Sequence, residues 1–121
     1  MIVGIGTDLV ENRRLERWLE HPRLLSRYFT ETELADVAAS AHPAASLAAR
    51  FAAKEAFGKA LGIGLKGLEL KTIEVRRAEG GRPDLHLAGP ALAAVQARSA
   101  RVHLSLSHEA HYAVAFVVLE A

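Results

Sequence analysis

A carboxylate follows directly after the first apolar run of the chain. Residues 1–7 have the composition of a short buried strand, and Asp8 comes next. A carboxylate at the end of such a strand is held rigidly, which suits a ligand of a divalent cation. The alternative is a local role, because Asp8 and Glu11 have the spacing of a capping box for a helix that starts at Leu9. This segment alone does not decide between the two, and the local role is the commoner one.

A second carboxylate stands in the most helix-favouring part of the chain. Glu55 and Lys59 are four residues apart and therefore share one helix face. A carboxylate can hold Mg²⁺, and the lysine can neutralise a phosphate bridged to that ion. Gly58 and Gly62 leave nearly the same face free of side chains, so that a bulky anion can approach the backbone. The alternative is an exposed Glu–Lys pair worth only about 0.2–0.5 kcal/mol.

Histidines occur near the carboxyl end, in the segment Ser105–His111. The spacing of His108 and His111 is not the i, i+4 pair of a zinc-binding helix, and no nucleophile-elbow pattern surrounds Ser107. A histidine at a strand end can bind a phosphate or simply finish a turn. We expect a turn for His111, and from spacing alone the role of His108 stays open.

Basic residues are concentrated in the first expected helix and its continuation. Arg14 and Arg17 share one helix face there, and the segment has more arginines than glutamates. Such a patch could steer an acidic partner. The alternative is a solvated helix face of mixed charge.

Local patterns predict the elements that must position these residues. The capping box of Thr30 and Glu33 predicts a short helix to about Ala39. Hairpins outnumber crossovers, which indicates an α+β fold with a mainly antiparallel sheet packed against a long helix. The remaining expected helices are 9–20, 45–61 (ended by Gly62 and Gly64) and 89–99, and the expected strands are 1–7, 70–77, 84–87, 102–107 and 112–119.

Composition limits the class of protein. A length of 121 residues fits one domain, residues 1–121, and a 50% hydrophobic content suggests that some apolar surface is buried between subunits. A net charge of +1 disfavours a nucleic-acid partner. The absence of cysteine, of a long apolar run and of a basic leader fits a cytoplasmic protein that does not insert into membranes.

Taken in order, the motifs of this chain closely resemble those of holo-acyl-carrier-protein synthases, the short, single-repeat group of 4′-phosphopantetheinyl transferases. The resemblance runs from the first residue to the last expected strand. The matching segments are 4–11 (GIGTDLVE), 29–31 (FTE), 50–56 (RFAAKEA), 73–75 (IEV), 81–83 (GRP) and 104–109 (LSLSHE). One departure lies after the long helix, where Ile63 replaces the usual threonine between two glycines.

The resemblance implies an activity and a set of partners. The enzyme would transfer the 4′-phosphopantetheine group of coenzyme A to a serine of an apo-acyl carrier protein, with Mg²⁺ as cofactor. It would release adenosine 3′,5′-bisphosphate, serve fatty-acid and lipid biosynthesis, and form a homotrimer with active sites between subunits. A non-catalytic nucleotide-sensing module is the alternative, although a sensor has no need of two metal-binding carboxylates.

The resemblance also implies roles for individual residues. Asp8 and Glu55 match the Mg²⁺ ligands, and Glu55 and Lys59 are the expected catalytic residues. Glu55, directly or through a water, is the candidate to take the serine proton, and Lys59 lies beside the phosphates. Arg14, with Arg17 on the same face, would dock the carrier. The positions that match contacts with coenzyme A are Arg50, Lys59, Gly62, Pro83, Ser107 and His108.

Overall fold

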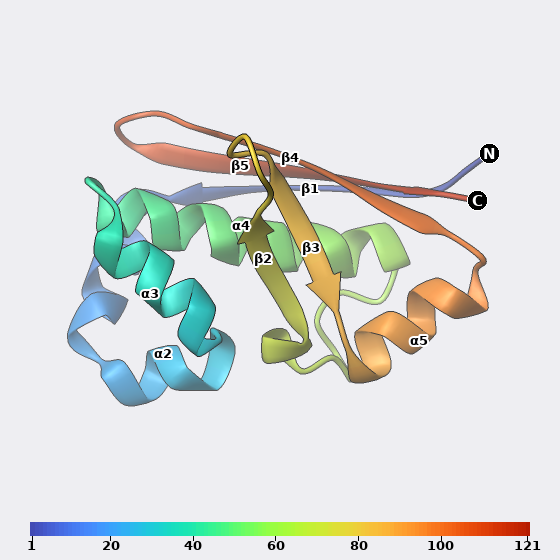
Figure 1. Ribbon diagram of the computed structural model, residues 1–121, viewed down its shortest axis with the longest axis horizontal. Coiled ribbons are helices and arrows are strands. Elements are labelled where there is room, and N and C mark those ends of the chain that lie inside the picture. The colour runs from blue at the N-terminus through green and yellow to red at the C-terminus, as the bar shows by residue number, and fades with distance from the viewer.

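The computed structural model describes residues 1–121 and is an α+β arrangement of two antiparallel sheets and five α-helices (Figure 1). A 3-10 helix, Arg17–Glu20, follows α1, and another, Leu70–Thr72, precedes β2. The elements in chain order are β1 (Ile2–Glu11), α1 (Asn12–Glu16), α2 (Pro22–Tyr28), α3 (Glu31–Ala39), α4 (Pro43–Leu61), β2 (Ile73–Arg77), β3 (Pro83–Leu87), α5 (Gly89–Ala97), β4 (Arg101–His108) and β5 (Tyr112–Glu120).

The larger sheet has the strand order β1-β5-β4, with both neighbouring pairs antiparallel. Alternation along β5 buries Ala113, Ala115, Val117 and Leu119 on one face, and α4 lies along that face (Figure 1). The predicted carboxyl-terminal hairpin is therefore confirmed. It forms the centre and one edge of the sheet.

The first strand is longer than the sequence indicated, and the prediction of a helix from Leu9 to Glu20 was wrong in its first part. Residues 7–11 pair with residues 112–116 of β5, so Asp8 lies within a strand and does not cap a helix. The strand ladder supplies backbone hydrogen bonds that outweigh a local cap. The first helix begins at Asn12, and its N-cap residue Glu11 makes no side-chain capping bond.

Helix α4 is the central element of the fold. Its 19 residues run from Pro43 to Leu61, and most of them are buried between the larger sheet and the other helices. Pro43 lies in the first turn of the helix, and Gly62 is its C-cap residue. The predicted glycine stop is confirmed, because Gly62 has a left-handed φ of 79°. The predicted long helix is confirmed, with a start two residues earlier than 45.

The smaller sheet pairs β2 with β3, and helix α3 packs beside it against α4. The predicted capping box at the start of α3 is present in both directions, since Glu33 N–H donates to Thr30 Oγ1 and Thr30 N–H donates to Glu33 Oε1. Pro83 opens β3 at the hairpin, as expected for a proline that donates no ladder bond.

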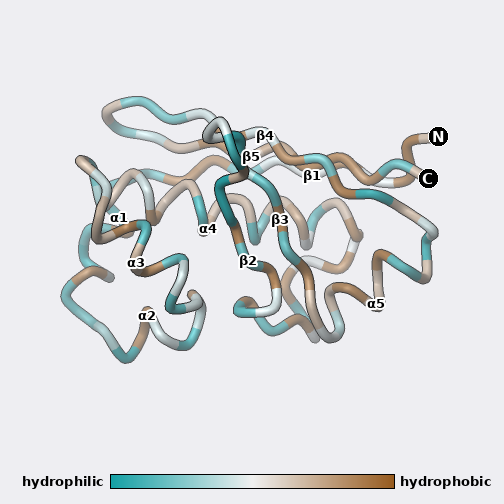
Figure 2. Tube along the Cα trace, viewed as in Figure 1, coloured by the Kyte–Doolittle hydropathy of each residue, from teal (hydrophilic) through white to brown (hydrophobic).

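Several large apolar side chains are exposed on the outer face of the larger sheet, and Figure 2 shows hydrophobic residues along the strands of this sheet. Ile5 and Leu9 on β1 are 62% and 64% exposed, and Phe116 on β5 is 45% exposed. Register places Thr7 directly opposite Phe116 and Ile5 directly opposite Val118 on this face. A single chain therefore covers only one side of its main sheet.

None of the helices has both the length and the apolar composition needed to cross a membrane.

Candidate active site

Strand β1 and helix α4 touch main chain to main chain. A Cβ atom at Gly4 would overlap the carbonyl oxygen of Ala60, and one at Gly6 would overlap that of Ala56. Only residues without a side chain allow this approach. The next residue on the same face of β1 is Asp8, which therefore lies over α4 at the turn that carries Glu55 and Lys59.

Lys59 reaches across to the strand. Its Nζ atom lies 3.1 Å from Asp8 Oδ1 and donates a second bond of 3.0 Å to the carbonyl oxygen of Thr7. The sequence predicted that Lys59 and Glu55 share a helix face, but the lysine forms its ion pair with Asp8 and none with Glu55. The structure thus brings Asp8, Glu55 and Lys59 together within one chain.

The electrostatics of Glu55 report the same proximity. Partial burial raises the pKa of the Glu55 carboxyl above its usual value, and the negative charge of Asp8 raises it further. Lys59 and Arg14 oppose this shift with positive charge. A divalent cation bound beside Asp8 and Glu55 would offset the negative charge that disfavours ionisation of Glu55.

The donor set fits Mg²⁺. This ion is commonly held by one or two carboxylates and completes its octahedral shell with water and substrate phosphates. Asp8 and Glu55 supply two carboxylates, and no third acidic or histidine ligand joins them. The remaining coordination positions would therefore face the solvent or a phosphate.

Arg14 and Arg17 lie beside this group, in a shallow cleft of about 580 Å³. Glu11, Arg13 and Trp18 complete its lining. The Arg14 guanidinium stacks 5.4 Å from the centre of the Phe51 ring, and the Trp18 ring meets Phe51 edge-on at 5.2 Å. The two arginines thus border an aromatic pair in which Phe51 is buried and Trp18 is half-buried.

Arg50 is not part of this group. It is 2% exposed, donates to Ser46 and forms a 3.5 Å ion pair with Asp36, while its Nε atom has no partner. Burial lowers the pKa of the Arg50 guanidinium, and Asp36 partly restores it. A ligand could contact Arg50 only by opening its pair with Asp36, so its predicted contact with coenzyme A stays a prediction.

The other predicted contacts with coenzyme A lie apart from one another. Gly62 ends α4 one turn beyond Lys59, and Pro83 is half-buried at the start of β3. Ser107 is exposed, on the face of β4 that points away from α4. One chain does not gather these residues around Asp8, and their roles stay predictions.

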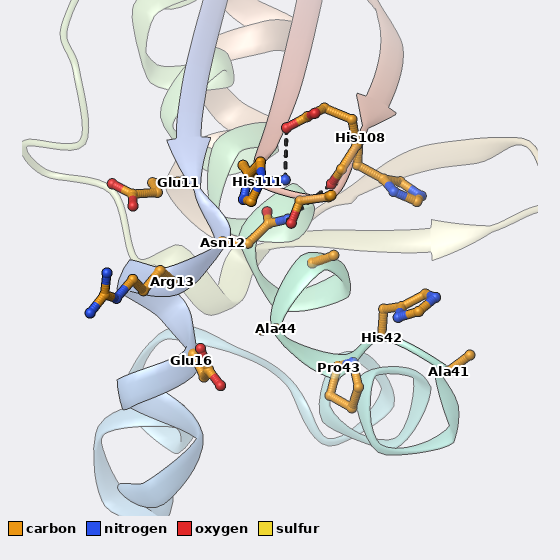
Figure 3. A pocket seen from close by; sticks show the side chains of 13 residues that line it. Glu11, Asn12, Arg13, Glu16, Ala41, His42, Pro43, Ala44, His108 and His111 are labelled. Atoms are coloured by element: carbon orange, nitrogen blue, oxygen red, sulfur yellow. Dashed lines mark hydrogen bonds between the residues drawn. The ribbon is translucent and has the colours of Figure 1, made fainter.

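His108 lines a separate cleft of about 910 Å³ between the end of β1, the start of α4 and the β4–β5 turn (Figure 3). His42 and His108 stand on one side of it, and Glu11 and Arg13 stand on the other (Figure 3). In the turn, the Glu109 carboxylate accepts the backbone N–H groups of His111 and Tyr112, which confirms the turn predicted for His111. Asp8 and Glu55 do not line this cleft.

Local patterns in the sequence do not reveal the role of Lys54. This residue is fully buried, and its ammonium donates to Glu33 Oε1 at 2.8 Å and to the carbonyl oxygens of Leu70 and Ile73. It thereby fixes the helix turn that presents the adjacent Glu55. A lysine inside an otherwise alanine-rich helix was the available signal, but its partners are distant in sequence.

Comparison with known proteins gives a consistent result. Residues 4–117 match the family model of the 4′-phosphopantetheinyl transferase superfamily. The chain is 53% identical over 122 residues to the holo-[acyl-carrier-protein] synthase of Treponema denticola, with 99% of each chain covered.

Solved structures agree with this match. The crystal structure of holo-[acyl-carrier-protein] synthase from Neisseria meningitidis is similar at a TM-score of 0.89 and 38% identity, with both chains covered in full. A holo-(acyl-carrier-protein) synthase from Bacillus anthracis in complex with CoA (3′,5′-ADP) gives a TM-score of 0.84 and 39% identity, covering 100% of this chain and 98% of that one.

Proposed function

The chain belongs to the 4′-phosphopantetheinyl transferase superfamily and is an enzyme of its holo-acyl-carrier-protein synthase group, and from this premise we propose its reaction. The enzyme transfers the 4′-phosphopantetheine group of coenzyme A to a serine of an apo-acyl carrier protein and releases adenosine 3′,5′-bisphosphate. The observation that carries the proposal is the meeting of Asp8, Glu55 and Lys59 at one junction of β1 and α4. Residues 1–121 form one transferase domain. A non-catalytic sensor is set aside.

Asp8 and Glu55 would hold Mg²⁺, which when bound neutralises charge on the pyrophosphate of coenzyme A. Support comes from the proximity of the two carboxylates, since burial raises the pKa of Glu55 and the charge of Asp8 raises it further. Their half-buried position leaves one side of the pair open to a phosphate. Lys59 supplies a further positive charge on that open side.

The protein's own groups position the reactants. The carrier's serine oxygen attacks the β-phosphorus of coenzyme A, and the bond from that phosphorus to the oxygen of the leaving bisphosphate breaks. Glu55, directly or through a water, takes the serine proton. Lys59 stabilises the negative charge on the leaving phosphate. Positioning accounts for most of the expected acceleration, as is usual in phosphoryl transfer.

The carrier approaches over Arg14 and Arg17. Both arginines line one cleft, and Arg14 lies close enough to Glu55 for its positive charge to oppose the rise in the pKa of that carboxyl. A carrier with an acidic surface would be steered to this face. The exposed edge of the Trp18 and Phe51 cluster would then meet an apolar side chain of that partner.

We also propose a homotrimer with active sites between neighbouring subunits. Support comes from the open apolar face of the larger sheet, which includes Ile5, Leu9 and Phe116. Assembly through this face would bury it. It would also bring Ser107, which lies on the same face, and the nearby His108 towards a neighbour's carboxylate pair.

The experiment that tests the reaction follows the mass of an apo-acyl carrier protein incubated with the enzyme, coenzyme A and Mg²⁺. The wild type should add one phosphopantetheine group. Asp8→Ala and Glu55→Ala should each reduce the rate by about 10²-fold or more while keeping a native circular dichroism spectrum. Glu69→Ala removes an exposed carboxylate outside the site and should leave the rate unchanged. Near-normal transfer by either site variant would refute the assignment.

A further inference from the structure

The Lys59 ammonium lies against two oxygen atoms of strand β1. It is 3.1 Å from Asp8 Oδ1, which belongs to a charged carboxylate, and 3.0 Å from the carbonyl oxygen of Thr7, which carries a partial negative charge. The Asp8 side chain is only 17% exposed, whereas that of Lys59 is 52% exposed. The carboxylate is thus fixed by its strand, and the lysine can move.

This contact is the only ion pair formed by either member of the carboxylate pair. Glu55 has no ion-pair partner, and its pKa is raised by burial and by Asp8. Arg14 contributes positive charge from a distance without contacting either carboxylate, because its guanidinium is stacked on Phe51. Lys59 is therefore the one cationic group in contact with the site.

We propose that Lys59 is an internal substitute for the divalent cation, holding Asp8 in the cation-free enzyme and leaving it when the cation binds. The inference rests on the proposed function, since it takes Asp8 and Glu55 as the cation's ligands. A lysine has a flexible four-carbon stem and a compact charge, so it can release one oxygen and turn to another without moving the helix. The released ammonium is then free for a phosphate of the incoming coenzyme.

The exchange links the binding of cation and coenzyme. A phosphate that draws Lys59 away from Asp8 leaves the carboxylate open to the cation, and a cation that displaces Lys59 frees it for the phosphate. By thermodynamic linkage each ligand must then raise the affinity for the other by the same factor. An ion pair that persisted in the loaded enzyme would contribute nothing to this coupling.

The test is direct binding of Mn²⁺, detected by the electron paramagnetic resonance of the free ion, without coenzyme A. Lys59→Met removes the ammonium but keeps a side chain of similar length. It should bind Mn²⁺ about fivefold or more tightly than wild type, the effect of removing a competing charge at contact distance in a partly solvated site. Arg14→Met is the matched control, because it removes a nearby charge that contacts neither carboxylate, and it should change the affinity less than about twofold. Equal effects of both variants, or weaker or undetectable binding by Lys59→Met, would overturn the inference.

Asp8→Asn separates failure of this inference from failure of the proposed function. If Asp8→Asn abolishes the Mn²⁺ binding of the wild type and of Lys59→Met, the cation site is established and the affinity ratio decides the role of Lys59. If Asp8→Asn leaves Mn²⁺ binding intact, the cation does not use Asp8, and both proposals fall.

Thermal unfolding provides a second measurement that does not depend on activity. In EDTA, Lys59→Met leaves Asp8 and Glu55 without a contacting positive charge, so its Tm should lie below that of the wild type. Saturating Mn²⁺ should close this gap, because the ion replaces what the lysine supplied. A difference in Tm that Mn²⁺ does not reduce would contradict the proposal that Lys59 substitutes for the cation.

Discussion

The ammonium of Lys54 lies 2.8 Å from Glu33 Oε1, and neither side chain is exposed to solvent. Glu33 also accepts the backbone N–H groups of Thr30 and Val75, so one carboxylate joins the start of α3, the middle of α4 and strand β2. Burial lowers the pKa of the Lys54 ammonium, and the charge of Glu33 opposes that shift. Because Lys54 precedes Glu55, this buried pair fixes the turn that carries the site.

Breaking this pair should destabilise the protein strongly. Glu33→Gln leaves the buried Lys54 ammonium without a counter-ion, and we expect the free energy of unfolding to fall by about 3–5 kcal/mol. Urea denaturation followed by circular dichroism measures the change. Glu31→Gln removes an exposed carboxylate from the same helical turn and should cost less than about 0.5 kcal/mol. Similar losses for the two variants would show that the buried pair is not important.

The contact of β1 with α4 should not tolerate a methyl group. Gly6→Ala places a Cβ atom against the backbone of Ala56, and relief requires strand and helix to separate. We expect a loss of about 3 kcal/mol or more, together with reduced transfer activity. Gly62→Ala is the control. Its Cβ meets no atom, so it should pay only about 1–2 kcal/mol for the left-handed φ of 79°.

The raised pKa of Glu55 predicts that Glu55→Gln increases the free energy of unfolding, by an amount that depends on pH. Because the pKa is raised in the folded state, the folded protein binds more protons than the unfolded chain above the ordinary value of 4.5, and stability falls as pH rises through this window. In EDTA at neutral pH, Glu55→Gln should therefore raise the free energy of unfolding, by no more than about 1 kcal/mol because the carboxyl is partly solvated. The gain should vanish below pH 4.5, as measured by urea denaturation across pH. A gain that persisted in acid would indicate a cause other than charge.

Carrier docking should be visible through Trp18, the only tryptophan of the chain. It borders the cleft of Arg14 and Arg17, so binding of an apo-acyl carrier protein should change its fluorescence. The double variant Arg14→Ala and Arg17→Ala should weaken this response about tenfold or more, while the affinity for coenzyme A changes less. Equal losses of both affinities would argue against a docking role.

The proposed trimer predicts the native mass of the protein. The wild type should have a native mass of three times its 13.0 kDa chain mass by light scattering. Phe116→Asp places a charge in the centre of the outer face of the larger sheet and should shift the mass towards that of the single chain. Leu92→Asp changes an exposed leucine on α5, outside the sheet, and should leave the mass unchanged. A wild-type mass equal to that of one chain would refute the trimer.

Local patterns predicted the elements whose ends are coded by a few adjacent residues. The capping box of Thr30 and Glu33, the glycine stop at Gly62 and the carboxyl-terminal hairpin were all recognisable because each depends on neighbours in sequence. The junction of β1 and α1 failed for the same reason. Asp8 has the spacing of a cap, but pairing with β5, more than a hundred residues away, decides that it belongs to a strand.

The sequence predicted which residues belong to the site better than it predicted the contacts between them. Spacing placed Glu55 and Lys59 on one helix face, and motif order added Asp8, but no local rule states that Lys59 pairs with the strand. The partners of Lys54 and Arg50 were inaccessible for the same reason. Both residues lie on α4 and bind carboxylates of α3. The local sequence of one helix does not predict which helix packs against it.

The glycine contact between β1 and α4 has a consequence for how this protein can vary. At Gly4 and Gly6 the backbone of β1 lies directly on the backbone of α4. No interdigitating side chain at these two positions therefore sets the distance between Asp8 and Glu55. Substitutions among the bulky residues of the interior can therefore weaken the fold while the spacing at the site is preserved. The spacing of Asp8 and Glu55 therefore depends on the absence of side chains at Gly4 and Gly6 more than on the size of the apolar residues in the core.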